Sequence, residues 1–276
     1  MTVPLRFGLV PRTFDGATSA ALDRIVQALA NTLGVRVGVM TFPAPAELER
    51  AFARGTCNLV WCSPTLALTS PTFRKGDALA TSVREGVALY HGVLITRSDS
   101  AITSPLALRG TRAAWVAPSS ASGYLYARVT LAGHGIDPED LFAREQFYGT
   151  HGGVVRAVLD GEADVGATFA VFEGGDPSRA LLRAGFHEVD GSQDALRVIL
   201  CTPSIPSELW VASTALVEEL GRDALIDALT KLDLHAPLAL ERCFGCDRLE
   251  RTSANDLEEL RRQLFDAEAL GVVAPD

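Results

Sequence analysis

Two short stretches of this chain are rich in groups that can bind an anion. Ser119 to Gly123 lies between an apolar run, 113–116, and a predicted helix that begins near Tyr124. Gly149 to Gly153 opens a second predicted helix, over 154–159. Hydroxyls and free backbone N–H groups at the positive end of a helix form an anion site. Two such helix starts within one α/β unit indicate a single shared ligand.

The residue types in these stretches suit an oxyanion. Ser120 and Ser122 carry hydroxyls, and the backbone N–H groups of Ala121, Ser122 and Gly123 complete a set of short-armed donors. His151 adds a donor whose charge can follow pH, because the unperturbed pKa of histidine is about 6.5. A serine-rich run is equally typical of a polar turn with a helix cap, so both interpretations stay open.

Alternating strands and helices must position these stretches. Apolar runs predict strands at 5–10, 35–41 and 58–62, which is typical of a parallel sheet. Thr13 follows the first strand and Ser63 the third, at the carboxyl ends where open α/β sheets bind ligands. Both are candidate ligand contacts, although each hydroxyl could instead cap the helix after it.

A second region repeats this alternation. Strand-like runs at 78–83 and 87–96 lead into it, and Tyr90-His91-Gly92 interrupts the second run. Tyr90 is a candidate to line a ligand cleft, or else packs between two lobes; His91 is expected at the surface or a hinge. Further strands are predicted at 111–116, 163–167 and 197–201, and further helices at 124–132, 152–159, 215–220, 223–232 and 256–268.

Composition excludes several classes of partner. The chain has 276 residues, of which 47% are hydrophobic, and a formal net charge of −9. It can bury a full core, and the acidic balance without a basic block argues against nucleic acid and anionic membranes. No run approaches the ~20 apolar residues of a spanning helix, so no membrane insertion is expected.

The five cysteines predict neither a disulfide framework nor a metal site. Cys243-Phe-Gly-Cys246 is the only C-x-x-C motif, with no second pair at zinc-site spacing. A metal or redox role for this pair is the alternative to packed or surface thiols. No cofactor is predicted.

A series of motifs occurs in a fixed order along the chain. They are Tyr90, Leu108-Arg109-Gly110, Ser120-Ala121-Ser122-Gly123-Tyr124, Gly135-Ile136-Asp137-Pro138, Phe142, Gly149-Thr150-His151, Gly161-Glu162-Ala163-Asp164-Val165-Gly166-Ala167 and Pro203-Ser204-Ile205-Pro206. This order resembles the PhnD-type phosphate, phosphite and phosphonate-binding proteins of ABC importers, over roughly residues 5 to 215.

The resemblance implies a two-lobed α/β fold of the type 2 periplasmic-binding-protein kind. Each lobe is expected to be a mixed, mostly parallel sheet flanked by helices, with the ligand cleft between the lobes. Residues 1–90 plus 205–276 are expected to form lobe 1, and 91–204 lobe 2.

The resemblance also implies non-catalytic binding of a small phosphorus oxyanion, with an ABC permease or a sensor protein as partner. Ser120, Ser122 and His151 would hold the oxyanion, and Tyr90 would line the pocket. Ala121 departs from the family pattern, because a hydroxyl residue is common there. No counterpart of the groups that hold an amino group is found in 41–46, so an aminoalkylphosphonate is not favoured.

Two questions stay open at this point. The family is periplasmic, yet the N-terminus enters a predicted strand without an export signal, so a cytoplasmic location or a removed signal is expected. The alternative function is an enzyme on the same fold, such as a chorismate-dehydrating enzyme of the menaquinone pathway. For such an enzyme, only His151 and Asp15 could serve as the acid or base in the cleft. A transcription regulator's effector module is set aside, because no helix-turn-helix precedes it.

Overall fold

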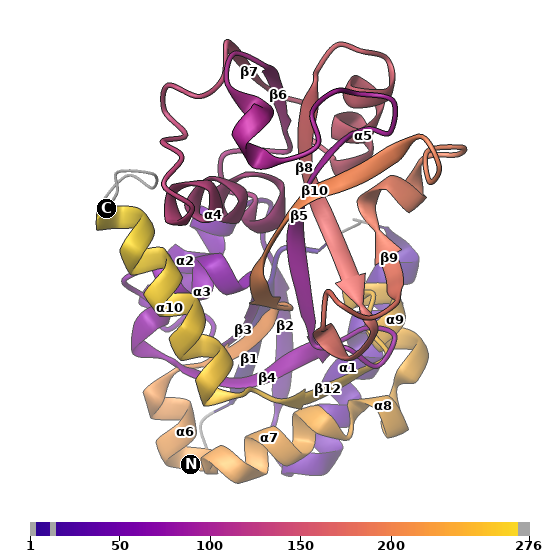
Figure 1. Ribbon diagram of the computed structural model, residues 1–276. Coiled ribbons are helices and arrows are strands. Elements are labelled where there is room, and N and C mark those ends of the chain that lie inside the picture. Colours follow the sequence, from indigo (N-terminus) through magenta and orange to yellow (C-terminus); the bar gives the residue numbers. More distant parts are fainter. Residues whose placement is uncertain (1–3, 12–14, 270–276) are drawn as a thin grey trace. The chain divides into compact units, whose positions relative to one another are not determined.

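The computed structural model of the chain describes residues 4–11 and 15–269 (Figure 1). The chain divides into two units, each with its own sheet. One unit comprises Met1–Ala88 and Pro206–Leu257, and the other comprises Leu89–Ile205 with the residues from Glu258 onward. The C-terminal helix α10 (Ala254–Ala269) therefore crosses a unit boundary, whereas the sequence analysis assigns it whole to the first lobe.

The first unit is built on a mixed sheet of six strands. Strand β1 pairs in parallel with β2 and β3, as three successive strand–helix units predict, while β11 and β12 run antiparallel to their neighbours. The order across the sheet is β12 (Arg248–Arg251), β4 (Asp77–Val83), β11 (Leu209–Ala212), β3 (Leu59–Cys62), β1 (Leu5–Leu9) and β2 (Val37–Thr41).

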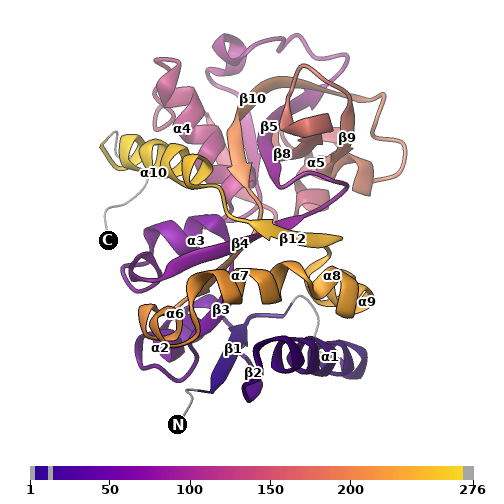
Figure 2. The ribbon, with the colours of Figure 1, turned by 90° about the horizontal axis from the view of Figure 1, so that it is seen from below.

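Helices cover both faces of this sheet. Helix α1 begins where the Asp15 carboxylate accepts from the Thr18 N–H at 2.7 Å, and it is capped at its C-terminal end by Gly34, whose φ of 67° favours glycine. Helix α1 (Gly16–Leu33) packs with α7 (Arg222–Thr230), α8 (Leu232–His235) and α9 (Pro237–Phe244), as Figure 2 shows. The remaining helices are α2 (Pro45–Ala53), α3 (Pro64–Thr69), η1 (Phe73–Lys75) and α6 (Thr214–Leu220).

Four aromatic side chains form the centre of this unit's core. Phe7 and Trp210 stack with ring centroids 4.6 Å apart, and Phe244 contacts both Trp210 and Trp61 at 5.0 and 5.1 Å. The Trp210 side chain is fully buried, yet its indole N–H has no hydrogen-bond partner within the described residues. Its contribution to stability is therefore packing alone.

Trp210 provides a test of this core. Trp210→Ala should lower the free energy of unfolding by about 3–5 kcal/mol, because it leaves a large cavity. Trp210→Phe keeps the ring stack and removes an unpaired buried donor, so it should cost far less. Urea unfolding of both variants measures the difference, and equal losses would contradict this account of the core.

The second unit carries a mixed sheet in which two strands lie parallel to β6. The order is β10 (Leu196–Pro206), β5 (Leu89–Arg97), β8 (Val165–Phe172), β6 (Arg112–Trp115) and β7 (Arg144–Phe147), and β9 (Leu181–Ala184) pairs with β8. Strand β6 is parallel to β7 and β8, while β5 and β9 are antiparallel to β8. Short helical turns are η2 (Pro105–Leu108), η4 (Glu173–Gly175) and η5 (Gly185–Glu188).

Strand β5 corrects one sequence prediction. It runs without a break through Tyr90, His91 and Gly92, because β8 pairs with it across His91↔Ala170 and Gly92↔Phe169. His91 is buried rather than at the surface. Its ring nitrogens lie 2.7 Å from the Thr202 carbonyl oxygen and 3.0 Å from that of Gly175.

The cysteines are packed thiols. All five are free, and four of them, Cys57, Cys62, Cys243 and Cys246, are buried. Burial raises the pKa of Cys243 and of Cys246 to about 11, so neither has the thiolate character that redox chemistry needs. Residues 4–11 and 15–269 contain no cluster of three metal-binding side chains and no helix that could cross a membrane.

Candidate functional site

The two donor-rich stretches follow neighbouring parallel strands. Strands β6 and β7 end side by side, with Trp115 opposite Phe147. The Tyr148 N–H donates to the Trp115 carbonyl at 2.8 Å, and the Gly149 N–H donates to the Val116 carbonyl at 2.9 Å. The chain after β6 enters a helix, η3 (Ala121–Leu125) continued by α4 (Tyr126–Gly133), and the chain after β7 enters α5 (His151–Leu159). Both helix starts therefore lie at one edge of one sheet.

The first helix start is a π-helical turn with tight packing. The Ser120 hydroxyl oxygen accepts from the Gly123 N–H at 3.1 Å, which caps the helix. A Cβ atom at Gly123 would lie 2.3 Å from Cγ2 of Val116, so no side chain fits there. Wide turns of this kind often occur at functional sites.

Ser122 is the buried serine of this turn. It is 3% exposed, and its backbone packs on β5, where a Cβ at Gly92 would lie 3.0 Å from the Ser122 carbonyl oxygen. The Ser122 hydroxyl makes no hydrogen bond to any residue within the described ranges. It is therefore available to a ligand, whereas the neighbouring Ala121 offers only its backbone.

The second helix start carries the imidazole. Thr150 caps α5 by accepting from the Gly153 N–H at 3.0 Å, and a Cβ at Gly153 would lie 2.8 Å from the Tyr148 carbonyl oxygen. His151 Nδ1 lies 3.1 Å from the Thr168 hydroxyl oxygen, and its ring meets Phe169 edge to face at 5.0 Å.

The charge of His151 differs from the sequence prediction. Burial lowers its pKa to about 4, because the surrounding protein disfavours the charged imidazolium. The ring is therefore neutral near pH 7, rather than a group whose charge follows physiological pH. It can offer a hydrogen bond but no ion pair.

Two tyrosines lie on the same side of the sheet as Ser122. Tyr90 precedes Gly92 by two residues on β5, so the two share a face of the strand. Tyr126 follows Ser122 by one helical turn, is fully buried, and has a hydroxyl without a partner among the residues described. Burial, and to a lesser extent Tyr90, raise the pKa of Tyr126. The Tyr126 hydroxyl is therefore neutral.

The structure brings six of the eight predicted site residues to this edge of the second unit. Ser63 belongs to the first unit, where it is exposed and accepts from the Leu66 N–H at 3.2 Å as the cap of α3. Thr13 lies outside the described residues. The six are Tyr90, Ser120, Ala121, Ser122, Gly123 and His151.

Sequence reasoning missed the residues of β8 and β9 that contact His151 or its neighbours. Thr168 and Phe169 touch the imidazole directly. The Arg183 guanidinium lies 5.2 Å above the Phe169 ring, and its Nε is buried without a partner in the described chain. The predicted strand at 163–167 ends just before Thr168. In the structure β8 continues to Phe172, and this longer strand brings Thr168 and Phe169 to His151.

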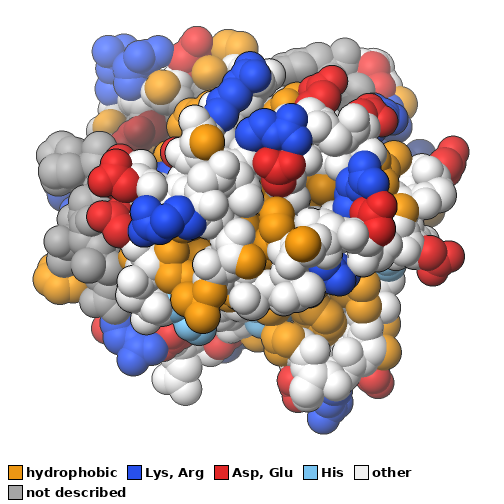
Figure 3. All heavy atoms as spheres, turned by 45° about the horizontal axis from the view of Figure 1, so that its top comes forward, with side chains coloured by type: hydrophobic (Ala, Val, Ile, Leu, Met, Phe, Trp, Pro, Cys, Tyr) orange, Lys and Arg blue, Asp and Glu red, His pale blue; other side chains and the backbone are white. Residues whose placement is uncertain are grey.

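Arg128, by contrast, is removed from the site. It is 2% exposed and pairs with Glu145 at 2.7 Å and with Glu139, so its charge is satisfied away from the ligand stretch. On the face drawn in Figure 3, basic and acidic side chains are interspersed. The donors at the two helix starts are therefore neutral groups.

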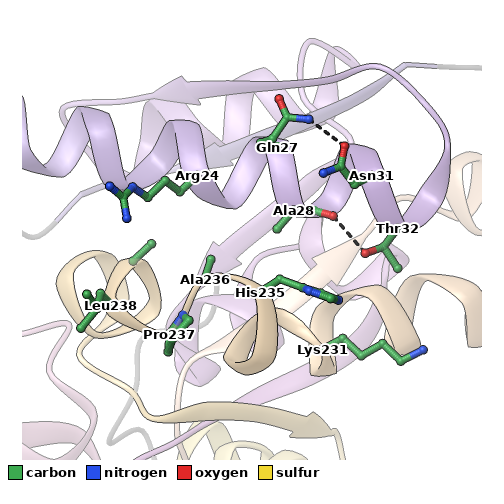
Figure 4. Close-up of a pocket in the computed structure, with 11 residues that line it drawn as sticks. Arg24, Gln27, Ala28, Asn31, Thr32, Lys231, His235, Ala236, Pro237 and Leu238 are labelled. Atoms are coloured by element: carbon green, nitrogen blue, oxygen red, sulfur yellow. Dashed lines mark hydrogen bonds between the residues drawn. The ribbon is translucent and has the colours of Figure 1, made fainter.

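A separate hollow lies on the first unit, between α1 and the α8–α9 segment (Figure 4). It measures about 780 Å³. Within it, Gln27 donates to Asn31 at 2.7 Å and Thr32 donates to the Ala28 carbonyl at 3.0 Å. It contains none of the predicted site residues.

Comparison with known families agrees with this arrangement. A family model described as "ABC transporter, phosphonate, periplasmic substrate-binding protein" matches residues 7–257. The chain belongs to this family. Members of this family are solute-binding components of phosphonate transporters and not enzymes. This confirms the predicted function as a non-catalytic binding protein. No curated protein sequence matches the chain significantly.

Solved structures share the fold at low identity. XAC2383 from Xanthomonas citri, bound to ATP, is 18% identical with a TM-score of 0.74, covering 98% of this chain and 99% of that one. A binding protein component of an ABC phosphonate transporter from Pseudomonas aeruginosa is 18% identical, with a TM-score of 0.65 and coverages of 99% and 89%. PhnD1 from Prochlorococcus marinus, in complex with methylphosphonate, is 17% identical with a TM-score of 0.64. The match covers 97% of this chain and 98% of that one. The periplasmic-binding-protein fold is confirmed.

The packing of Gly123 predicts a sharp effect of one methyl group. Gly123→Ala should destabilise the protein by about 1–3 kcal/mol, because the added Cβ overlaps Val116 and must shift the helix start. Gly133→Ala is the matched control, since nothing lies within 4 Å of its Cβ. Thermal unfolding of both variants distinguishes them, and a neutral Gly123→Ala would contradict the tight turn.

The buried imidazole predicts a pH dependence of stability. Its pKa is about 4 in the folded protein and about 6.5 when unfolded, so its contribution is complete above pH 6.5 and is lost as pH falls toward 4. His151→Gln should therefore flatten the stability profile between those values. His134→Gln, at an exposed position, should leave the profile unchanged. Urea unfolding at several pH values measures both, and parallel wild-type and His151→Gln profiles would refute the lowered pKa.

Proposed function

We propose that the second unit binds the tetrahedral head of a phosphorus oxyanion at the starts of η3 and α5. The observation that carries this proposal is the pairing of β6 with β7, which ends both strands at one edge. Hydroxyls of Ser120 and Ser122, the backbone N–H groups after them, and the imidazole of His151 would surround the anion. Tyr90 would line the same pocket.

Neutral donors are sufficient for such a ligand. A charged acceptor makes hydrogen bonds roughly twice as strong as those between neutral groups. Helix N-termini add a favourable dipole, so an anion needs no ion pair at the contact itself. The Arg183 guanidinium, which lies over the Phe169 ring beside His151, would add a longer-range attraction.

Phosphate, phosphite and an alkylphosphonate without an amino group are the ligands we favour. Ala121 lacks the hydroxyl that is common in the family at its position, which removes one donor. No acidic residue has been found at the site to hold a ligand amino group, which disfavours aminoalkylphosphonates. We propose that the loaded protein then docks on an ABC permease. A related sensor protein would use the same site. The position of the ligand cleft between the two lobes remains a prediction.

A panel of anions tests the ligand class. Thermal unfolding is measured with phosphate, phosphite, methylphosphonate, aminoethylphosphonate, ATP, sulfate and chorismate. A ligand at a hundred times its dissociation constant adds about 2.7 kcal/mol, which at roughly 2–4 °C per kcal/mol raises Tm by about 5–10 °C. A shift with phosphate, phosphite or methylphosphonate supports the proposal. A response to chorismate or sulfate alone would overturn it.

Ser122 gives the sharpest test of the site itself. Ser122→Ala removes a hydroxyl that makes no hydrogen bond to any described residue, so affinity for the oxyanion should fall by roughly tenfold or more. Ser119→Ala is the matched control, because Ser119 is exposed in the same turn. Titration calorimetry with methylphosphonate compares them. Equal affinities would remove Ser122 from the site.

A further inference from the structure

Thr168 has only one hydrogen-bond partner in the described parts of the chain. Its side chain is fully buried, and its hydroxyl oxygen lies 3.1 Å from His151 Nδ1. A Cβ at Gly185 would lie 1.9 Å from this oxygen and 3.2 Å from the His151 Cβ. The Gly185 backbone, directly after β9, therefore packs against both Thr168 and His151. Among the described residues, the Thr168 hydroxyl proton therefore has no acceptor other than the imidazole.

This geometry selects one tautomer of the neutral ring. If His151 carried its proton on Nδ1 and donated it to Thr168, the threonine proton would be buried without an acceptor. An unsatisfied buried donor is unfavourable, by an amount comparable to a lost hydrogen bond. If Thr168 donates to Nδ1, every proton of the pair is satisfied and the ring proton must reside on Nε2.

The opposite ring nitrogen is free for a ligand. His151 Nε2 makes no hydrogen bond within the described residues, and it does not belong to the fully buried polar atoms that lack a partner. His151 is partly buried rather than enclosed. Nε2 therefore keeps access to solvent while Nδ1 is held by β8.

We infer that Thr168 is a positioning residue that fixes His151 as an Nε2–H donor toward the anion. This rests on the proposed function and names the form of the ligand. The Nε2–H group can only donate, and a negatively charged phosphoryl oxygen is a stronger acceptor than the oxygen of a P–OH group, so His151 favours the charged oxygen. The donor persists across the neutral pH range, and His151 does not exchange a proton with the ligand.

The tautomer can be read directly in the wild-type protein. Long-range ¹H–¹⁵N correlation spectra at pH 7, with His151 assigned by comparison with His151→Gln, report which ring nitrogen carries the proton. The expected result is a proton on Nε2, with Nδ1 accepting a hydrogen bond. A proton on Nδ1 would overturn the inference, whether or not an oxyanion binds.

Two variants connect the tautomer to binding. Thr168→Ser keeps the hydroxyl and should retain the Nδ1 hydrogen bond and near wild-type affinity for methylphosphonate. Thr168→Val removes the hydroxyl, so the Nδ1 signal should move to that of an unbonded nitrogen and affinity should fall about fivefold or more. Equal Nδ1 signals and affinities in the valine and serine variants would refute the positioning role.

The outcomes separate the two proposals. Absence of binding to every phosphorus oxyanion, with an Nε2–H ring bonded to Thr168, would reject the proposed function and leave the tautomer established. Binding of methylphosphonate with the ring proton on Nδ1 would support the proposed function and reject the positioning role of Thr168.

Discussion

The pairing of β6 with β7 is the constraint on which the candidate site depends. Two hydrogen bonds beyond the strand ends, from Tyr148 to Trp115 and from Gly149 to Val116, extend this pairing into the loops. The two helices that follow must then start close to the same strand ends. A donor set drawn from stretches that are separate in sequence is thereby made rigid by backbone contacts, before any ligand arrives.

Close packing of glycines makes this rigidity possible. Gly92, Gly123 and Gly185 each lie where a Cβ would be 3.0 Å or less from a neighbouring atom. Neighbouring side chains and, at Gly92, the Ser122 backbone therefore pack directly on these glycines, and the polar groups there have little room to move. Such preorganisation reduces the ordering cost of binding, which neutral donors need more than charged ones do.

The sequence predicts the elements well because their signals are local. Gly34 ends α1 in the left-handed region, and Ser63 with Pro64 starts α3, as residue type alone indicates. It also locates both donor-rich helix starts. The environment of His151 could not be predicted from the sequence, because it depends on Thr168 in β8 and on Gly185 at the start of η5, and these segments come together only in the folded unit. The same reason explains the misplacement of His91: its burial depends on β8 and on carbonyl groups of distant segments.

The neutrality of the contact groups affects kinetics as well as affinity. The chain has a net charge of −9, so an approaching anion meets a repulsive field that dissolved salt screens. In the proposed site, a bound anion would be held by short-range hydrogen bonds that salt weakens much less. Ionic strength should therefore act mainly on the association rate, which rises as the field is screened, while the dissociation rate stays nearly constant. A protein of this kind captures its ligand more readily in a saline medium than in a dilute one.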